Sequence, residues 1–384
     1  MRTPGLVTIA MLAMLGAPAC NEDRGPPAVA TATDPAPRRR IERLFWSGHS
    51  LIDRPLPDYL AAVAASLDQP VQWNMQVIPG SSIKSRSRGT EAWGGYRQGS
   101  NHLGSELDVA AELASPRTVA GGPYDALIIT EQHSLLGSLV WNDTIRHLRH
   151  FHDRAIAGNA GQTTYLYQSW LGIDDRDDLR RWIAYERAAA TAWRCVATRI
   201  NVSLAATKRP DRIVPIDAGA ALATFVERVL AGRLPSLAGP PRTVIDQIFE
   251  DDVHLTPLGT YFVALFVFAE MSGTRPTGAW APDAINPARA QDLQDAAWTI
   301  HRERAGALQS PSLDVCRGYV GGPFLQHYLA YMRDKQVRDE GRMRAYIRWL
   351  KHRLAFARVF SRQDVRNPLV FDAAADSDYW LSEI

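Results

Sequence analysis

Three polar residues far apart in the chain have the types and the setting for hydroxyl chemistry. Ser50 follows a short apolar run and a turn glycine, Gly48, so it lies at the start of the next helical segment. The amide groups at a helix N-terminus lower the cost of a nearby negative charge. Asp251 and His254 are three residues apart in a turn, where the carboxylate can hold the imidazole through Nδ1. The other ring nitrogen is then free to take a proton from a hydroxyl.

Two more segments place polar groups directly after apolar runs. Gly80 follows the second run, and a glycine lets a backbone N–H approach a ligand oxygen without a side chain in the way. Glu131 and Gln132 follow the third run, and Glu131 there is an alternative acid–base group. Ser81 and Ser82 are weaker candidate nucleophiles than the first serine because neither follows the first run.

The segments that carry these residues predict an α/β fold. Apolar runs alternate with helical patterns, which favours right-handed crossovers and a three-layer α/β/α sandwich around a five-stranded parallel sheet. In such sheets ligands bind beyond the carboxyl ends of the strands, where the polar residues lie. The predicted strands are Arg43–Ser47, Val71–Ile78, Asp125–Glu131, Thr163–Ser169 and Arg212–Asp217. The predicted helices are Leu56–Leu67, Ser105–Ala114, Leu179–Ala206, Ala218–Leu230, Pro257–Ser272 and Gln291–Arg304.

The composition is that of an ordinary globular protein. The chain has 384 residues and a formal net charge of +2, with 46% hydrophobic and 22% charged residues. These values argue against intrinsic disorder and against a large nucleic-acid-binding surface. The length allows one large domain with an appendage. The single long apolar run lies at the N-terminus, so the chain is not a polytopic membrane protein.

The N-terminus has the features of an export signal. Arg2 precedes the apolar run Leu6–Leu15, which is too short to span a bilayer. Small residues at Ala17 and Ala19 suit a signal peptidase, and Cys20 follows where a bacterial lipoprotein carries its lipid. We therefore expect a signal peptide over residues 1–19, a flexible tether over residues 20–40, and a periplasmic or cell-envelope lipoprotein. Plain secretion, with Cys20 not lipidated, is the alternative.

The two remaining cysteines are Cys195 and Cys316. In an oxidising compartment they can form a disulfide, which would stabilise the fold by about 4–5 kcal/mol because it closes a long loop. Two buried free thiols are the alternative. The sequence has no Cys-x-x-Cys pair, which excludes a zinc ribbon and a thioredoxin-like site.

In their order along the chain, these features resemble the SGNH (GDSL-like) hydrolases. Residues Gly48 to Leu51 (GHSL) look like the first block of that family, with His49 in place of the usual aspartate. Gly80 matches the glycine of the second block, and Asp251 to His254 matches the Asp-x-x-His of the fifth. The resemblance covers residues 41–307, so it implies a hydrolase domain over 41–308 and a separate C-terminal extension.

The third block of the family, a glycine and an asparagine, is absent. Glu131 and Gln132 stand there instead, as in a subset of similar proteins. Gln132 carries the same amide donor on a stem one methylene longer. The resemblance therefore implies an oxyanion hole made of the backbone N–H groups of Ser50 and Gly80 and the side-chain amide of Gln132.

The resemblance also implies a reaction. Ser50 is the expected nucleophile, His254 its general base and Asp251 the carboxylate that orients the base. We expect an exported esterase that hydrolyses acyl esters, above all O-acetyl groups on carbohydrate, without metal or organic cofactor. A glycan-binding envelope protein with weak or no catalysis, and an acyltransferase with the same triad, are the alternatives. The expected partners include no nucleic acid, and a membrane only through the lipid at Cys20.

His49, beside the serine, is expected to make a local hydrogen bond. Three clusters of residues, one of histidines, one of acidic residues and one of aromatic residues, are expected to have structural roles. One helical segment is expected to expose its histidines to solvent rather than bind a metal: His147, His150 and His152. A group of acidic residues is expected to cap the following helix rather than bind calcium: Asp174, Asp175, Asp177 and Asp178. Four aromatic residues near the rim are expected to pack under loops, with stacking on sugar rings as the alternative: Trp93, Tyr96, Trp141 and Trp170.

Residues 309–384 form the predicted helical C-terminal extension, with one or two amphipathic helices between Phe324 and Phe360. We expect the apolar stripe to pack on the catalytic domain and the basic face to lie in solvent. A surface helix that binds an anionic envelope polymer or lipid is the alternative. The stripe contains Met343, Tyr346, Ile347, Leu350 and Leu354. The basic residues are Arg342, Arg344, Arg348, Lys351, Arg353 and Arg358.

Overall fold

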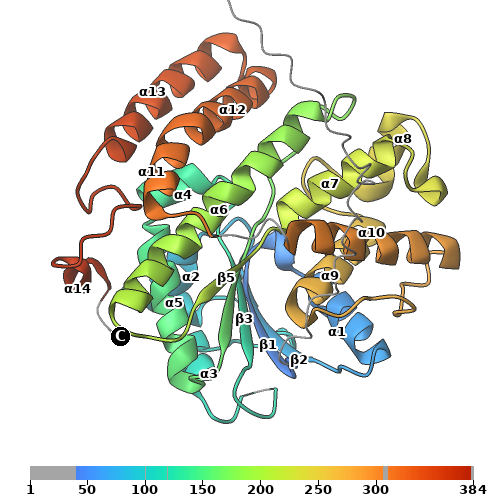
Figure 1. Ribbon diagram of the computed structural model, residues 1–384, viewed down its shortest axis with the longest axis horizontal. Helices are drawn as coiled ribbons and strands as arrows, with labels where there is room; N and C mark the ends of the chain where they lie inside the picture. Colours follow the sequence, from blue (N-terminus) through green and yellow to red (C-terminus); the bar gives the residue numbers. More distant parts are fainter. Residues whose placement is uncertain (1–39, 100, 119, 306–309, 382–384) are drawn as a thin grey trace, which may run out of the picture. The chain divides into compact units, whose positions relative to one another are not determined.

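Five parallel strands pair in one sheet with the order β2-β1-β3-β4-β5 (Figure 1). β3 is fully buried and β1 nearly so, as expected for strands covered by helices on both faces. The α/β class and the five-stranded parallel sheet predicted from the sequence are therefore confirmed. The strands are β1 Arg43–Gly48, β2 Gln72–Val77, β3 Ala126–Thr130, β4 Thr163–Tyr167 and β5 Ile213–Ile216.

The computed structural model describes residues 40–99, 101–118, 120–305 and 310–381. The predicted signal peptide, nearly all of the tether, and Cys20 lie outside the described residues. The described residues belong to one compact unit.

Helices cover both faces of the sheet (Figure 1). α9 is buried on nearly all sides, which is typical of a helix enclosed by other elements. The layer that contains it holds α1 Leu56–Ser66, α7 Ala218–Leu230, α9 Pro257–Ser272 and α10 Pro287–Ala305. The opposite layer holds α2 Ile83–Ser87, α3 Val109–Ala114, α5 Thr144–Gly158 and α6 Arg180–Ala206. Two more short helices are α4 Leu135–Trp141 and α8 Pro241–Ile248.

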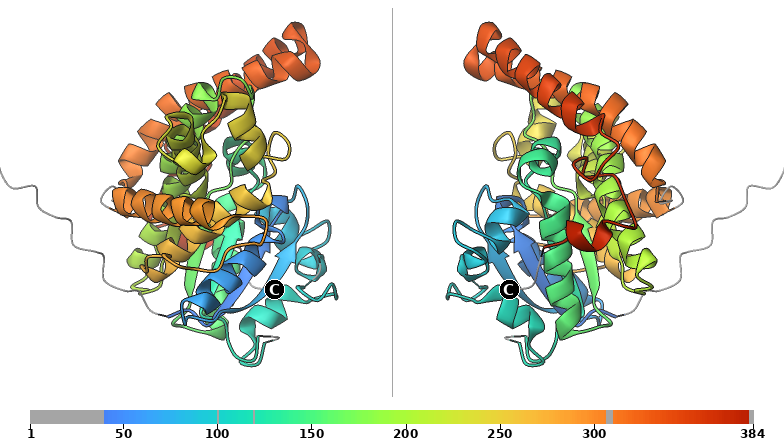
Figure 2. Two further views of the ribbon diagram at one scale, coloured as in Figure 1. Left: turned by 90° about the vertical axis from the view of Figure 1, so that its right-hand side faces the viewer. Right: turned by 90° about the vertical axis from the view of Figure 1, so that its left-hand side faces the viewer.

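The C-terminal extension is helical, as predicted, and packs on α6. A disulfide joins Cys195 on α6 to Cys316 on α11. The alternative of two buried free thiols is therefore wrong. α12 and α13 run side by side as a hairpin (Figure 2), with Gly341 between them at a φ of +83°. The extension contains α11 Leu313–Tyr319, α12 Leu325–Glu340, α13 Arg342–Phe360 and α14 Asp376–Tyr379.

The packing expected for α13 is wrong in one respect. The apolar stripe does not pack on the domain, because its five side chains are 50–77% exposed. Ala345, Phe356 and Phe360, on other sides of the helix, are the buried residues instead. None of the described helices is long and apolar enough to cross a membrane.

Candidate active site

Ser50, His254 and Asp251, the three residues predicted from the sequence to activate a hydroxyl group, lie next to one another in the structure. Ser50 Oγ lies 3.1 Å from Nε2 of His254, although the two residues are 204 positions apart. His254 Nδ1 lies 2.7 Å from Oδ2 of Asp251. The serine follows β1, and the other two residues lie in the turn before α9, so the carboxyl edge of the sheet is where they meet. The arrangement is that of a nucleophile, a base and an orienting carboxylate.

The turn after β1 is shaped by two neighbours of the serine. A Cβ at Gly48 would lie 2.3 Å from Ile52 Cδ1, so only glycine fits between β1 and the short helix Ser50–Ile52. His49 is buried, and its Nδ1 accepts from the Leu51 N–H at 3.4 Å. Its Nε2–H therefore donates to the carbonyl oxygen of Glu131 at 3.1 Å. His49 makes the local hydrogen bonds expected of it.

The protonation of His49 agrees with this structural role. Burial, helped by the charge of Arg86, lowers the pKa of His49 to about 3. The imidazole is therefore neutral at neutral pH and holds the turn without adding a charge beside Ser50.

Asp251 holds both the histidine and the turn that carries it. Its Oδ1 accepts from the backbone N–H groups of Val253 and His254, each at 2.7 Å. Burial alone would raise the pKa of Asp251, but the hydrogen bonds from the His254 ring and from the two amides lower it to about 2. The carboxylate is ionised at neutral pH and fixes the tautomer of His254 with the proton on Nδ1.

Two residues outside the turn brace it, and neither role was predicted. The buried indole of Trp170 donates to the carbonyl oxygen of Val253 at 2.8 Å. Arg176 donates to the carbonyl oxygens of Asp251 at 2.7 Å and Phe249 at 3.2 Å. Both donors bind backbone atoms, so their side-chain types alone gave no sign of the contact.

The groups predicted to donate to a negative oxygen follow the carboxyl ends of β1, β2 and β3. Gly80 has a φ of +67°, which favours glycine at this position. The Nε2 of Gln132 donates to the carbonyl oxygen of Gly80 at 3.0 Å, and this bond uses one of the two amide hydrogens. Within the described residues, no acceptor takes the backbone N–H of Ser50 or Gly80. The three groups predicted for an oxyanion hole therefore lie in loops at the same edge of the sheet.

Glu131 is buried completely, so the alternative of an acid–base group on the rim is wrong. Its Oε1 accepts from the backbone N–H groups of Ile83 at 3.2 Å and Gln132 at 2.6 Å. Its Oε2 accepts from the Thr144 hydroxyl at 2.7 Å. Burial raises the pKa of Glu131, while the charge of Arg86 opposes the rise. The carboxyl group locks the loop that carries the Gln132 amide.

Arg86 is a second buried residue that holds the site and was not predicted. Its guanidinium donates to Ser47 Oγ at 3.1 Å, to Ser81 Oγ at 2.8 Å and to the Thr130 carbonyl oxygen. Burial lowers the pKa of Arg86 to about 10, so it remains a cation at neutral pH. Ser81 is thus engaged by Arg86, and Ser82 caps α2 by accepting from a backbone N–H of that helix. Neither serine replaces Ser50.

A pocket of about 390 Å³ opens beside Ser50 and His254. Its wall is apolar at Leu51, Leu255 and Val263. Charged residues line another part of the wall, namely Asp53, Arg54 and Glu250. The pocket can therefore receive a small ligand with one apolar and one polar part.

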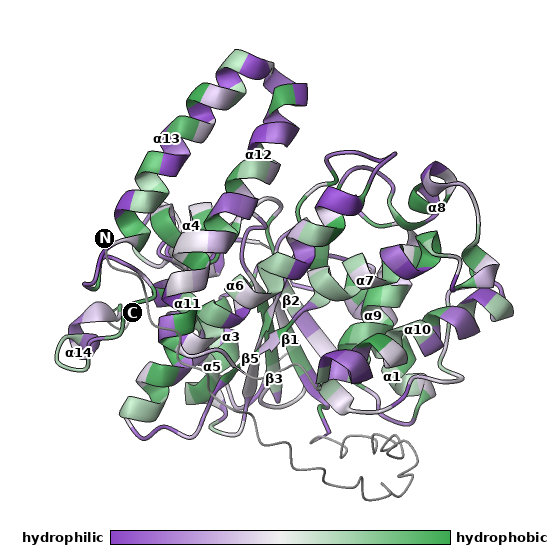
Figure 3. Ribbon diagram, turned by 45° about the horizontal axis from the view of Figure 1, so that its top comes forward, coloured by the Kyte–Doolittle hydropathy of each residue, from purple (hydrophilic) through white to green (hydrophobic). Residues whose placement is uncertain are grey.

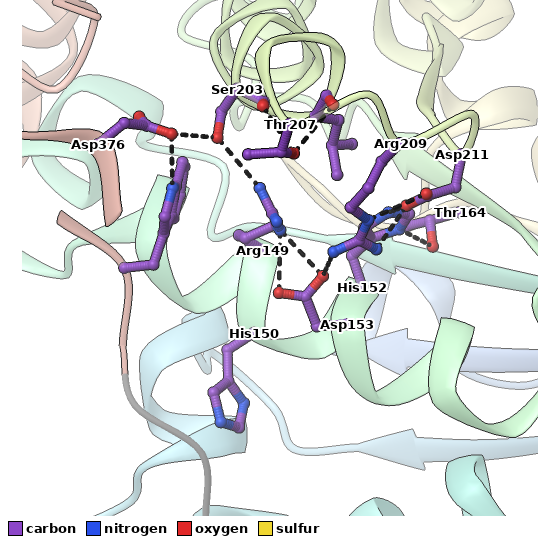
Figure 4. A network of polar contacts seen from close by, with 12 residues as sticks. Arg149, His150, His152, Asp153, Thr164, Ser203, Thr207, Arg209, Asp211 and Asp376 are labelled. Atoms are coloured by element: carbon purple, nitrogen blue, oxygen red, sulfur yellow. Dashed lines mark hydrogen bonds and ion pairs between the residues drawn. The ribbon is translucent and has the colours of Figure 1, made fainter. Parts of the chain in front are cut away.

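The three histidines of α5 are buried, so the expectation that they face solvent is wrong. His152 binds Thr164 Oγ1 at 2.9 Å and Asp211 Oδ2 at 2.7 Å (Figure 4). His147 binds Ser87 Oγ at 2.9 Å, and His150 binds the Tyr96 hydroxyl at 2.8 Å. Each of the three imidazole rings is hydrogen-bonded to a side chain on another segment, so the rings can be buried. Within the described residues, no group of three His, Cys, Asp or Glu side chains is placed to hold a metal ion.

The acidic cluster before α6 caps that helix through one residue, as expected. Asp178 Oδ1 accepts from the backbone N–H of Arg180, the first residue of α6, at 3.1 Å. The four carboxylates also pair with arginines on α6, α8 and α12, because these helices place cations around the loop. The pairs are Asp174–Arg181 at 2.5 Å, Asp175–Arg338 at 2.9 Å, Asp177–Arg242 at 3.5 Å and Asp178–Arg180 at 2.5 Å.

Three of the four aromatic residues near the rim pack inside the protein. Tyr96 and Trp170 are buried, and Trp93 stacks on His150 with 3.8 Å between the ring centroids. Trp141 is 49% exposed and lies against Phe356 of α13. Stacking of a sugar on Tyr96 or Trp170 is therefore excluded.

Comparison with known proteins gives one distant structural similarity. No model of a known protein family matches the chain, and no curated protein sequence does. The chain is similar to the crystal structure of a DUF4886 family protein from Bacteroides uniformis ATCC 8492, with 15% sequence identity and a TM-score of 0.45. The match covers 71% of this chain and 98% of the other. A similarity this distant carries no argument about function, which must be inferred from the site itself.

Proposed function

We propose that the protein is a serine esterase of the SGNH type that hydrolyses short acyl esters, above all O-acetyl groups on carbohydrate. The observation that supports this most directly is the continuous hydrogen-bonded chain from Ser50 Oγ through His254 to Asp251. A serine is a weak nucleophile until a positioned base takes its proton. The buried Glu131 and Arg86 support the proposal, because their hydrogen bonds hold the loops around the site and a catalytic site needs such support.

The geometry supports a two-step reaction. His254 Nε2 takes the proton of Ser50 Oγ as the oxygen attacks the ester carbonyl carbon. The carbonyl oxygen becomes an oxyanion, which the N–H groups of Ser50, Gly80 and Gln132 stabilise. His254 then protonates the leaving alcohol. Water, deprotonated by His254, attacks the acyl-enzyme in the second step, and Ser50 recovers its proton as the acid leaves.

The pocket suits a short acyl group on a polar alcohol. The apolar wall at Leu51, Leu255 and Val263 can take the acyl group. On the charged wall, Arg54 can donate hydrogen bonds to hydroxyl oxygens of the alcohol, and Glu250 can accept hydrogen bonds from its hydroxyl groups. An acyltransferase would use the same residues, with a second alcohol in place of water.

Export is part of the proposal. The apolar N-terminal segment and Cys20 indicate a secreted lipoprotein. The disulfide between Cys195 and Cys316 agrees with this, because such bonds persist in oxidising compartments and are rare in the cytosol.

The first test is hydrolysis of 4-nitrophenyl acetate and of acetylated oligosaccharides by the purified protein. We expect a burst of nitrophenolate equal to the protein present, followed by steady release of acetate. Acyl transfer to an added sugar in place of acetate release would identify the acyltransferase. Binding of the oligosaccharides without any release of acetate would identify a binding protein and contradict the proposal.

Gln132→Leu is expected to lower kcat by about 10²–10³-fold while KM changes little, because an oxyanion donor acts mainly in the transition state. Leucine keeps the size of the side chain and removes the amide. Gln326→Leu, on the exposed side of α12, is the matched control and should leave kcat unchanged. Steady-state kinetics with 4-nitrophenyl acetate measure both variants. An unchanged kcat in Gln132→Leu would remove this residue from the oxyanion hole.

A further inference from the structure

One helix face in the C-terminal hairpin is apolar and largely exposed, with the Tyr346 ring partly covered by Arg333 of α12. The side chains of Met343, Tyr346, Ile347, Leu350 and Leu354 are 77%, 51%, 65%, 50% and 64% exposed. Single exposed apolar residues are normal, but a continuous group of them marks an interaction surface. These five residues recur at spacings of three and four, so they form one stripe along α13, which we call the α13 stripe.

The α13 stripe lies away from the side of the helix that packs on the protein. Ala345 and Phe356 are buried, and at about 100° per residue they lie roughly opposite the stripe. Phe356 contacts Tyr328 of α12 and Trp141 of α4, so this side is the one that joins the hairpin to the rest of the protein. The stripe therefore faces outward, and from Met343 to Leu354 it extends about 17 Å along α13.

Cations border the α13 stripe on both sides. α13 contains no acidic residue, and its six basic residues are all exposed. Hydrophilic and hydrophobic segments follow one another along its ribbon (Figure 3). By the same angular spacing, Arg342 and Arg353 lie on one side of the stripe, and Arg344, Arg348 and Lys351 lie on the other. Arg348 pairs with Glu340 at 2.8 Å. An apolar stripe with a cationic border is the pattern of a helix that lies in the interface of a membrane.

We propose that α13 docks the protein on an anionic lipid surface, with the α13 stripe in the boundary between headgroups and acyl chains. The bordering arginines and Lys351 then contact lipid phosphates. Burial of the five apolar side chains supplies the hydrophobic part of binding, and the cations supply the electrostatic part. This surface is separate from the Ser50 site, so docking does not depend on the proposed esterase activity.

Charge favours a lipid surface over a second copy of the chain as the occupant. Two α13 helices packed stripe to stripe would bring two sets of six cations together, and α13 has no carboxylate of its own to separate them. Like charges across an interface oppose association. An anionic bilayer instead offers negative phosphates to every basic residue around the stripe.

The test is co-sedimentation of the full chain with vesicles of phosphatidylcholine, with and without about 30% phosphatidylglycerol. All proteins carry Cys20→Ser, so no attached lipid contributes. Binding is expected on anionic vesicles and should weaken with salt. Leu354→Gln should lower the partition coefficient about tenfold, and Arg344→Gln about fivefold. Leu103→Gln, with a side chain 70% exposed elsewhere, and Arg233→Gln are the matched controls and should bind as the parent does.

Three results would overturn the proposal. The first is equal binding to neutral and anionic vesicles, and the second is binding that Leu354→Gln leaves unchanged. The third is a dimer in sedimentation velocity that Leu354→Gln dissociates, without vesicle binding, which would assign the α13 stripe to a second copy. Ester hydrolysis by the same variants should stay at the parent level. A loss of docking with activity intact, or the reverse, therefore separates this proposal from the proposed function.

Discussion

Ser50→Ala is expected to lower kcat for ester hydrolysis by at least about 10⁴-fold, because it removes the nucleophile of the proposed reaction. The side chain is partly buried, and its hydroxyl has one partner, His254 Nε2, among the described contacts. Its loss should therefore leave the fold intact, so thermal unfolding should change little. Hydrolysis of 4-nitrophenyl acetate and differential scanning fluorimetry on the same preparations measure both effects.

Ser82→Ala is the control for this prediction. Ser82 is the nearby serine that could act in place of Ser50, but it caps α2. Its replacement should cost about 1 kcal/mol of stability and retain most of the activity. Full activity in Ser50→Ala, or a collapse in Ser82→Ala without unfolding, would show that the nucleophile has been assigned to the wrong residue.

Asp251→Asn is expected to lower kcat by about 10⁴-fold. One oxygen of the asparagine can still accept from the N–H groups of Val253 and His254, so the turn keeps its shape. The NH₂ group then faces His254 Nδ1, which must become an acceptor. The ring proton moves to Nε2, and the histidine can no longer take the proton of Ser50.

Asp252→Asn is the matched control, since it makes the same change one position away. Its carboxylate lies 3.9 Å from Arg176 and 4.0 Å from Lys335, at the surface and outside the hydrogen-bonded chain of the site. We expect kcat of this variant to stay close to the parent value. A similar loss in both variants would point to a general electrostatic effect, and a loss below tenfold in Asp251→Asn would contradict the orienting role.

The parts of the fold predicted correctly are those in which local pattern and tertiary packing agree. β1, β3 and β4 are short segments that are buried along nearly their whole length, and α9 is an apolar helix that begins with Thr256 as its cap. These signals are contained in short stretches of sequence. The site followed from them, because parallel strands bring their carboxyl ends, and hence Ser50 and Gly80, to one edge.

The residues that were misassigned depend on partners that are distant in sequence. The histidines of α5 have the spacing of a polar face, but Thr164, Asp211, Ser87 and Tyr96 bury and satisfy them. Arg86 sits in a polar run that looks like a loop, and only the folded chain surrounds it with acceptors. The spacing of residues along one helix does not reveal which side chains of other helices or strands will form hydrogen bonds with them.

In α5, residues expected to be exposed are buried, and in α13 the reverse holds: apolar residues expected to be buried are exposed. The periodicity of α13 predicted one apolar stripe correctly, since five apolar residues do share one side of the helix. The burial expected of that stripe is wrong, because all five residues are exposed. Which side packs inward is decided by Phe356 and Ala345 against α12 and α4. The stripe is thus left for an external surface, and its exposure is visible only in the folded structure.

The measurement that tests the central claim most directly is active-site titration with a fluorescent fluorophosphonate, which reacts only with an activated serine. The parent protein should be labelled at one site per chain, and both Ser50→Ala and His254→Ala should remain unlabelled. Mass spectrometry of the labelled peptide should place the adduct on Ser50. Absence of labelling in the parent, or equal labelling of the parent and Ser50→Ala, would contradict the assignment of this protein as a serine esterase.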